Sequence, residues 1–231
     1  MKAFDSLPGY ARSAASIVLL AGALGGCATQ TVSPAEPERL VADARTTLSN
    51  FIRDPDQTWI QENLGRARAV LIAPQLVRAG FIFGGSGGRG VLLARDGTTW
   101  AGPAFYNLGT VSVGFQAGVD VSEAIIVVMT EKGLNSLLSN SFKMGGDASI
   151  AAGPVGAGAR STVTADLITF TRSKGVYGGL NLDGTVVSPN IAWNDAYFGG
   201  TNRLPPDILI RRSVVNAGAQ PLIMDVARAT K

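Results

Sequence analysis

The pattern of apolar and polar positions divides the chain into helical ends and a long central region of strands. Over residues 38–52 apolar side chains recur every three or four positions, which predicts an amphipathic helix. A helix-start signal at Asp54-Pro55 predicts a second, short helix that ends at Gly65. Further helices are expected at residues 131–140 and 188–198 and from about Ala219 onward.

Between these helices the apolar positions follow the periodicity of strands. The pairs Asp96-Gly97 and Asp183-Gly184 are typical of hairpin turns. Residues 110–121 alternate between apolar and polar, which predicts one half-buried strand or a bent pair of strands. The other predicted strands cover residues 69–73, 79–83, 91–95, 98–101, 125–129, 165–172 and 176–182.

Together these elements predict an α+β fold in a single domain. We expect a meandering, largely antiparallel β-sheet or a partly closed barrel, with helices at the N- and C-terminal ends. No linker after residue 37 divides the chain.

Two residue counts exclude much of catalysis. The 231 residues include no histidine and one cysteine. A Ser-His-Asp triad, a Cys-His pair and the usual structural zinc sites all need residues that this chain lacks. We therefore expect no enzyme activity, no metal and no cofactor. An enzyme that works through carboxylates or lysine is left open as an alternative.

The remaining composition indicates a folded, turn-rich protein. Charged residues make up 16% of the chain, below the usual ~25%, and 29 residues are glycine. The net charge is only +3, and no dense stripe of Lys and Arg is present, so we expect no nucleic-acid partner.

The first residues are typical of a bacterial lipoprotein signal. Lys2 and Arg12 precede an apolar run over residues 14–24, which is too short to span a membrane. The run ends in Leu24-Gly25-Gly26-Cys27, which resembles the lipobox, in which the cysteine is acylated and the chain is cut before it. Cys27 is therefore the predicted lipidation site, and palmitate is among the acyl chains that we expect it to carry. An incidental cysteine is the alternative.

These signals give the expected organisation of the chain. Residues 1–26 form a lipoprotein signal peptide, residues 27–37 a flexible tether and residues 38–231 the folded domain. Ala28 follows the cysteine in place of aspartate, and by resemblance to enterobacterial sorting signals this favours the outer membrane. We expect a lipid-anchored protein on its inner leaflet, facing the periplasm.

Two sequence motifs suggest a functional site but have a simpler explanation. Residues 85–90 match G-x-G-x-x-G, but a strand is predicted after them where a nucleotide-binding helix is needed, so a glycine-rich connection between strands is expected. Asp120 and Glu123 are close enough in sequence to suggest a carboxylate pair, although such spacing is a common accident.

Basic residues at predicted strand ends and turns form the candidate lipid-headgroup site. Arg78, Arg89, Arg172 and Lys174 are the residues that we expect to gather on one rim, where they would bind phosphate through charge-assisted hydrogen bonds. An ordinary solvated rim is the alternative.

Several segments in order resemble the SYLF domain, a lipid-binding module of bacterial lipoproteins and of eukaryotic cortical proteins. The resemblance covers roughly residues 38–230. It is carried by residues 69–74 (AVLIAP), 77–81 (VRAGF), 84–93 (GGSGGRGVLL), 103–106 (PAFY), 114–118 (GFQAG), 147–156 (DASIAAGPVG) and 172–179 (RSKGVYGG).

The resemblance implies phospholipid binding and no established catalytic residues. Phosphoinositides are ligands of eukaryotic members, and actin association is reported for fungal ones. We therefore expect a membrane-anchored periplasmic lipoprotein whose domain binds phospholipid, through a basic rim or by holding an acyl chain in a cleft. The alternative is a structural or protein-interaction lipoprotein that holds an envelope protein partner and binds no lipid through its domain.

Overall fold

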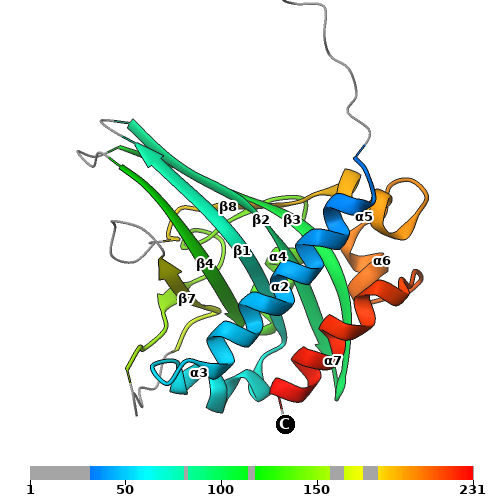
Figure 1. Cartoon of the computed structure of the whole chain (residues 1–231), viewed down its shortest axis with the longest axis horizontal. Helices are drawn as coiled ribbons and strands as arrows, with labels where there is room; N and C mark the ends of the chain where they lie inside the picture. The colour runs from blue at the N-terminus through cyan, green and yellow to red at the C-terminus, as the bar shows by residue number, and fades with distance from the viewer. Residues whose placement is uncertain (1–31, 81–82, 114–117, 157–163, 174–181, 231) are drawn as a thin grey trace, which may run out of the picture. The chain divides into compact units, whose positions relative to one another are not determined.

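Eight strands form one curled sheet in the computed structural model (Figure 1). Their order is β5-β8-β3-β2-β1-β4-β7-β6, and every pair is antiparallel except β6 with β7. The predicted α+β class and meandering sheet are confirmed. The strands are β1 (Ala69–Gly80), β2 (Phe83–Asp96), β3 (Thr99–Val113), β4 (Gly118–Val128), β5 (Phe142–Lys143), β6 (Ile150–Ala152), β7 (Leu167–Ser173) and β8 (Val186–Pro189).

The structure describes residues 32–80, 83–113, 118–156, 164–173 and 182–230. Among them, no helix has the length and apolar character needed to cross a membrane. The helices are α2 (Ala35–Arg53), α3 (Thr58–Asn63), α4 (Glu131–Leu138), α5 (Ile191–Phe198), α6 (Pro205–Leu209) and α7 (Gln220–Ala229), with the short 3₁₀ turns η2 (Leu64–Arg66) and η3 (Ala217–Ala219).

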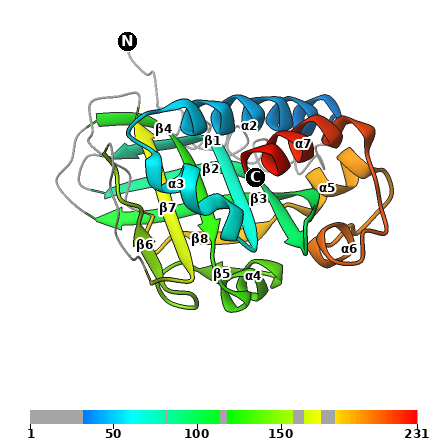
Figure 2. The same ribbon diagram turned by 90° about the horizontal axis from the view of Figure 1, so that it is seen from below.

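The sheet separates two apolar cores. One core lies on the side covered by α2 and α7, which we call the α2 side, and the other on the side of α4, which we call the α4 side (Figure 2). Along β1, Val70 and Ile72 pack on the α2 side, whereas Leu71 and Ala73 pack on the α4 side. Because both faces are covered here, β1 starts as an unbroken apolar run.

Helix α2 follows the predicted apolar stripe. Val41, Ala44, Leu48 and Phe51 are buried against the sheet, at the spacing of one helix face. The helix begins at Ala35, so it includes the last residues of the expected tether, and no side chain caps its start. Acidic residues in its first turn and Arg53 in its last complement the helix dipole.

Strand β1 is longer than the sequence predicts. Residues 69–73 and 79–80 belong to one strand that continues past Pro74, where the register shifts against both β2 and β4. Proline has no N–H to donate to a ladder, and a bulge accommodates it inside a sheet. Predicting two separate strands, at 69–73 and 79–83, with a break after residue 73 was therefore wrong.

The glycine-rich segment is part of a strand. Residues 85–90 lie within β2 and pair with both β1 and β3, so expecting a connection between strands was wrong. A Cβ at Gly90 would lie 2.9 Å from the Ile72 carbonyl oxygen, and one at Gly88 would collide with the Gln75 carbonyl oxygen. The glycines allow close backbone approach, and no helix follows them, which argues against a dinucleotide-binding turn.

Other differences concern short elements. Of the alternating residues 110–121, residues 110–113 belong to β3 and residues 118–121 to β4, which is the bent pair of strands given as one of the two alternatives; residues 114–117 lie outside the described residues. Helix α6 and strand β8 were not predicted. Of the predicted strand at 176–182, only Leu182 lies within the described residues.

Candidate functional site: an arginine-lined groove

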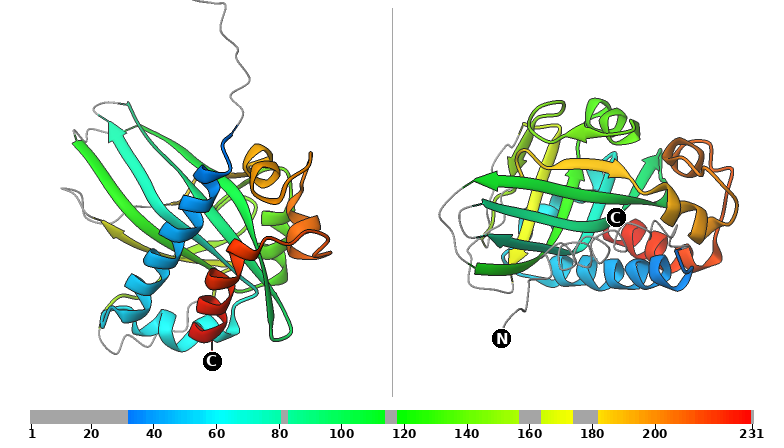
Figure 3. Two further views of the ribbon diagram at one scale, coloured as in Figure 1. Left: turned by 45° about the vertical axis from the view of Figure 1, so that its right-hand side comes forward. Right: turned by 90° about the horizontal axis from the view of Figure 1, so that it is seen from above.

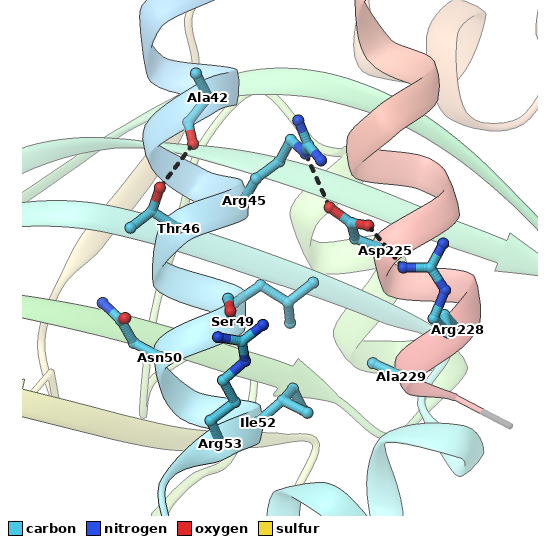
Figure 4. Close-up of a pocket in the computed structure, with 11 residues that line it drawn as sticks. Ala42, Arg45, Thr46, Ser49, Asn50, Ile52, Arg53, Asp225, Arg228 and Ala229 are labelled. Atoms are coloured by element: carbon cyan, nitrogen blue, oxygen red, sulfur yellow. Dashed lines mark hydrogen bonds and ion pairs between the residues drawn. The ribbon is translucent and has the colours of Figure 1, made fainter.

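A groove of about 890 Å³ lies between α2 and α7 (Figure 4). Arg45, Ser49 and Arg53 are spaced four residues apart on α2, so they form one line along the helix. From the facing helix, Asp225 and Arg228 extend toward this line. The two helices therefore present three arginines and one aspartate to the same opening.

The aspartate fixes two of the three arginines. Its Oδ2 accepts a hydrogen bond from Arg45 Nε at 2.8 Å, and its Oδ1 accepts one from Arg228 Nη1 at 3.3 Å. Such exposed pairs contribute about 0–1 kcal/mol to stability, so their main effect is orientation. For Arg53, the described part of the chain offers no ion pair or hydrogen-bond acceptor to the guanidinium.

The groove is anchored to the sheet below it. Leu48 of its lining is buried in the core, and Asn50 donates to both carboxylate oxygens of Glu123 on β4, at 3.2 and 3.3 Å. Glu123 is itself buried. This contact holds the last turns of α2 against β4, between Arg45 and Arg53 of the groove.

The arrangement suits anion binding. A guanidinium presents its N–H groups in a planar fork that matches phosphate or carboxylate oxygens, and several such forks neutralise a dianion. The single lining carboxylate is already shared by Arg45 and Arg228, so the groove offers donors to a ligand and no free base for proton transfer.

A smaller hollow of about 370 Å³ lies beside the first turns of α2. The charged residues that line it are Glu36, Arg39, Asp43 and Arg89. The Arg89 guanidinium stacks 4.6 Å from the ring centre of Trp193, which orients it while leaving the side chain exposed.

The structure does not bring the predicted basic residues onto one rim. Arg78 lies on β1 and faces the α4 side, two residues beyond buried Leu76. Arg89 and Arg172 both face the α2 side, but β1 and β4 separate their strands. Lys174 and Cys27 lie outside the described residues.

The suggested carboxylate pair is also not brought together. Asp120 points to the α4 side, where its Oδ2 accepts from the Ser122 hydroxyl at 2.6 Å. Glu123 points to the α2 side and Asn50. The two carboxylates lie on opposite faces of β4, which excludes joint acid–base chemistry.

Sequence reasoning missed the three groove arginines. Arg45 and Arg53 were visible in the sequence eight residues apart, about two helical turns, on the polar face of the predicted first helix. Arg228 lies 175 positions after Arg53, and only the packing of α7 beside α2 brings it to the same groove.

The sheet and its terminal helices define a small α+β domain with a groove between α2 and α7. A sequence model of the Ysc84 family, described as Las17-binding protein actin regulator, matches residues 109–229. The chain belongs to this family, for which SYLF is another name, so the resemblance seen in the sequence is confirmed.

Several curated relatives are eukaryotic proteins. An SH3 domain-containing protein of Schizosaccharomyces pombe is 30% identical over 192 residues, covering 77% of this chain and 43% of the relative. Protein YSC84 of Saccharomyces cerevisiae is 29% identical over 183 residues, covering 75% and 38%. An SH3 domain-containing YSC84-like protein 1 of Xenopus laevis is 26% identical over 160 residues, covering 67% and 47%.

The chain spans less than half the length of these relatives. No solved structure matches it. Two of these names refer to SH3 domains, and that of another relative, LAS seventeen-binding protein 3 of Saccharomyces cerevisiae, refers to binding.

Proposed function

We propose that the protein is a lipid-anchored, non-catalytic lipoprotein of the bacterial envelope whose domain binds phospholipid headgroups. The observation that carries the proposal is the groove between α2 and α7, which Arg45, Arg53 and Arg228 line together with a single described aspartate, Asp225. Membership of the SYLF family, in which lipid binding is known, supports it.

The anchor is assigned to Cys27 on the sequence that precedes it. Acylation of this cysteine, with cleavage before it, would leave the mature chain attached to the bilayer by its first residue. Two or three acyl chains give stable attachment. Ala28 at the next position supports sorting to the inner leaflet of the outer membrane, with the domain in the periplasm.

Anchoring lowers the affinity that the groove needs. A tethered domain samples the surface of its own membrane at a high effective concentration, so weak headgroup contacts suffice. In the groove, Arg53 is available to a phosphate as it stands, and Asp225 holds Arg45 and Arg228 in place beside it. Because the side chains are exposed, added salt should weaken the binding.

Vesicle flotation tests the headgroup function without the anchor. Residues 28–231 contain every described element and both cores, so this soluble form keeps the fold. It should float with vesicles that contain phosphatidylglycerol and not with pure phosphatidylcholine. The bound fraction should fall as salt rises from about 50 to 500 mM. Equal flotation with both vesicles would rule out recognition by charge.

A protein-interaction role is the second candidate. The family description names a Las17-binding protein, and one curated relative is a LAS seventeen-binding protein, so members of the family bind proteins. Crosslinking in the envelope distinguishes the two roles. A single stoichiometric protein partner, retained when the groove arginines are replaced, would favour the protein-interaction role.

A further inference from the structure

The free ends of the central strands have an inverted distribution of polar residues. On β4, Asp120 and Ser122 face the α4 side and are 1% and 0% exposed. Between and before them, Val121 and Val119 face the α2 side, and Val119 is 62% exposed. The neighbouring strand repeats the pattern, because Arg78 faces the α4 side while Val77 and Ala79 face the α2 side.

Register places these outward-facing residues in two rows across the sheet. Directly paired residues of antiparallel strands share a face. The row nearer to α2 consists of Val121, Val77, Gly87, Gly109 and Val186, and the outer row of Val119, Ala79, Gly85 and Val111. We call these nine residues the strand-end face.

The strand-end face is apolar and open. None of its residues is charged, and its valines at 77, 111, 119 and 186 are 39%, 88%, 62% and 45% exposed. The strands extend past the end of the helical cover, as Figure 1 and the right-hand view of Figure 3 show. An apolar surface that exposes several neighbouring valines usually marks a contact with a partner or a membrane.

The start of α2 joins this face to the expected anchor. Glu36 and Arg39 in the first turns of α2 line the same hollow as Val77 and Gly87 of the strand-end face. Residues 28–34 separate Cys27 from the helix, and a fully extended chain of that length spans about 25 Å. If Cys27 is acylated, the bilayer that holds it therefore lies within reach of the strand-end face, which makes this bilayer the nearest candidate to cover the face.

We infer that the strand-end face is the surface on which the domain rests on the bilayer that holds its anchor. This inference rests on the proposed acylation of Cys27. The valines lie in the boundary between headgroups and acyl chains, where burial of apolar area stabilises the contact. At the edge of the face, Arg89 is held by Trp193 at the level where it binds lipid phosphate.

Single-cysteine labelling tests the inference on the intact lipoprotein. Acylation consumes the thiol of the only cysteine, so Val111→Cys or Val119→Cys introduces the single free thiol. The lipoprotein carrying a polarity-sensitive fluorophore at either position is reconstituted into phosphatidylethanolamine–phosphatidylglycerol vesicles. Val215→Cys is the matched control, because this valine is 76% exposed and lies outside the strand-end face.

The inference predicts blue-shifted emission and severalfold weaker quenching by aqueous iodide at positions 111 and 119, with no change at 215. Equal quenching at all three positions would overturn it. Protection at 111 and 119 that depends on protein concentration and not on lipid would also overturn it, in favour of a second copy on this face.

The readout separates this inference from the proposed function. The intact mass of the protein shows whether Cys27 is acylated before the fluorescence is measured. A mass without acyl chains would refute the proposed anchor. When the anchor is present, groove variants that lose headgroup binding should show the same emission and the same iodide quenching at positions 111 and 119. Exposed labels on an anchored protein that still binds headgroups would refute only the strand-end contact.

Discussion

Arg45 on α2 donates from Nε to Asp225 on α7 at 2.8 Å and so joins two residues 180 positions apart. The same carboxylate accepts from Arg228. One acid thus holds two arginines that would otherwise repel each other, and the groove keeps its positive character because Arg53 adds a third.

Replacing Asp225 distinguishes its two effects on the groove, which are to orient the arginines and to lower the positive charge. Asp225→Asn removes one negative charge from the groove, so binding to phosphatidylglycerol vesicles at low salt should rise by about fivefold, as expected for one unit charge at close range in water. Stability should change by less than about 1 kcal/mol, because the pairs are exposed. Vesicle titration and thermal denaturation measure the two effects. Weaker binding would contradict an electrostatic groove.

Asn194 is predicted to be a structural residue. It is fully buried, accepts from the Phe105 N–H at 2.8 Å and donates to the Arg203 carbonyl at 3.0 Å. Asn194→Leu leaves both partners unsatisfied and should cost about 2–4 kcal/mol. The melting temperature should fall by about 5–10 °C. The control is Asn107→Ala, which loses one exposed hydrogen bond and should barely shift it.

Acid stability should depend on Asp166. Hydrogen bonds from the Thr130 hydroxyl, the Ser149 N–H and the Ser149 hydroxyl, with the nearby Lys132 ammonium, hold the pKa of this carboxyl far below its usual value. A lowered folded-state pKa stabilises the fold above the unfolded pKa of about 3.9, and this contribution is lost as the pH falls below it. Circular dichroism during acid titration should show a flatter decline for Asp166→Asn. An unchanged acid midpoint would contradict this account.

The predicted anchor is tested by one substitution. Cys27→Ser should abolish incorporation of labelled palmitate and leave the signal peptide uncut, because the acylated thiol is absent. Arg53→Gln keeps Cys27 and should take up label as before. Palmitate uptake by the Cys27→Ser protein would place the acyl chain elsewhere.

The parts of the fold with local signals could be predicted from the sequence. The stripe through Val41 and Phe51 predicted α2, and Asp96-Gly97 predicted the hairpin between β2 and β3. The bulge at Pro74 could not be predicted, because proline normally ends a strand and only the flanking strands show that the ladder resumes.

The candidate site was less visible, because it depends on how distant helices pack. The sequence suggested basic residues at strand ends, but alternation along β1 and β2 sends Arg78 and Arg89 to opposite faces. The outward valines of the strand-end face were visible in residues 110–121 as an alternating pattern. The sequence could not show that these valines are exposed, because this depends on how far α2 extends over the sheet.

The most direct test of the central claim is vesicle flotation of residues 28–231 with Arg45, Arg53 and Arg228 all replaced by glutamine. The control is Arg211→Gln, since Arg211 is also exposed and paired with an aspartate, Asp207, but lies outside the groove. We predict that the triple variant loses binding to phosphatidylglycerol vesicles by at least about tenfold while its fold is unchanged, and that the control binds like the wild type. Wild-type binding by the triple variant would contradict the assignment of the groove as the phospholipid site.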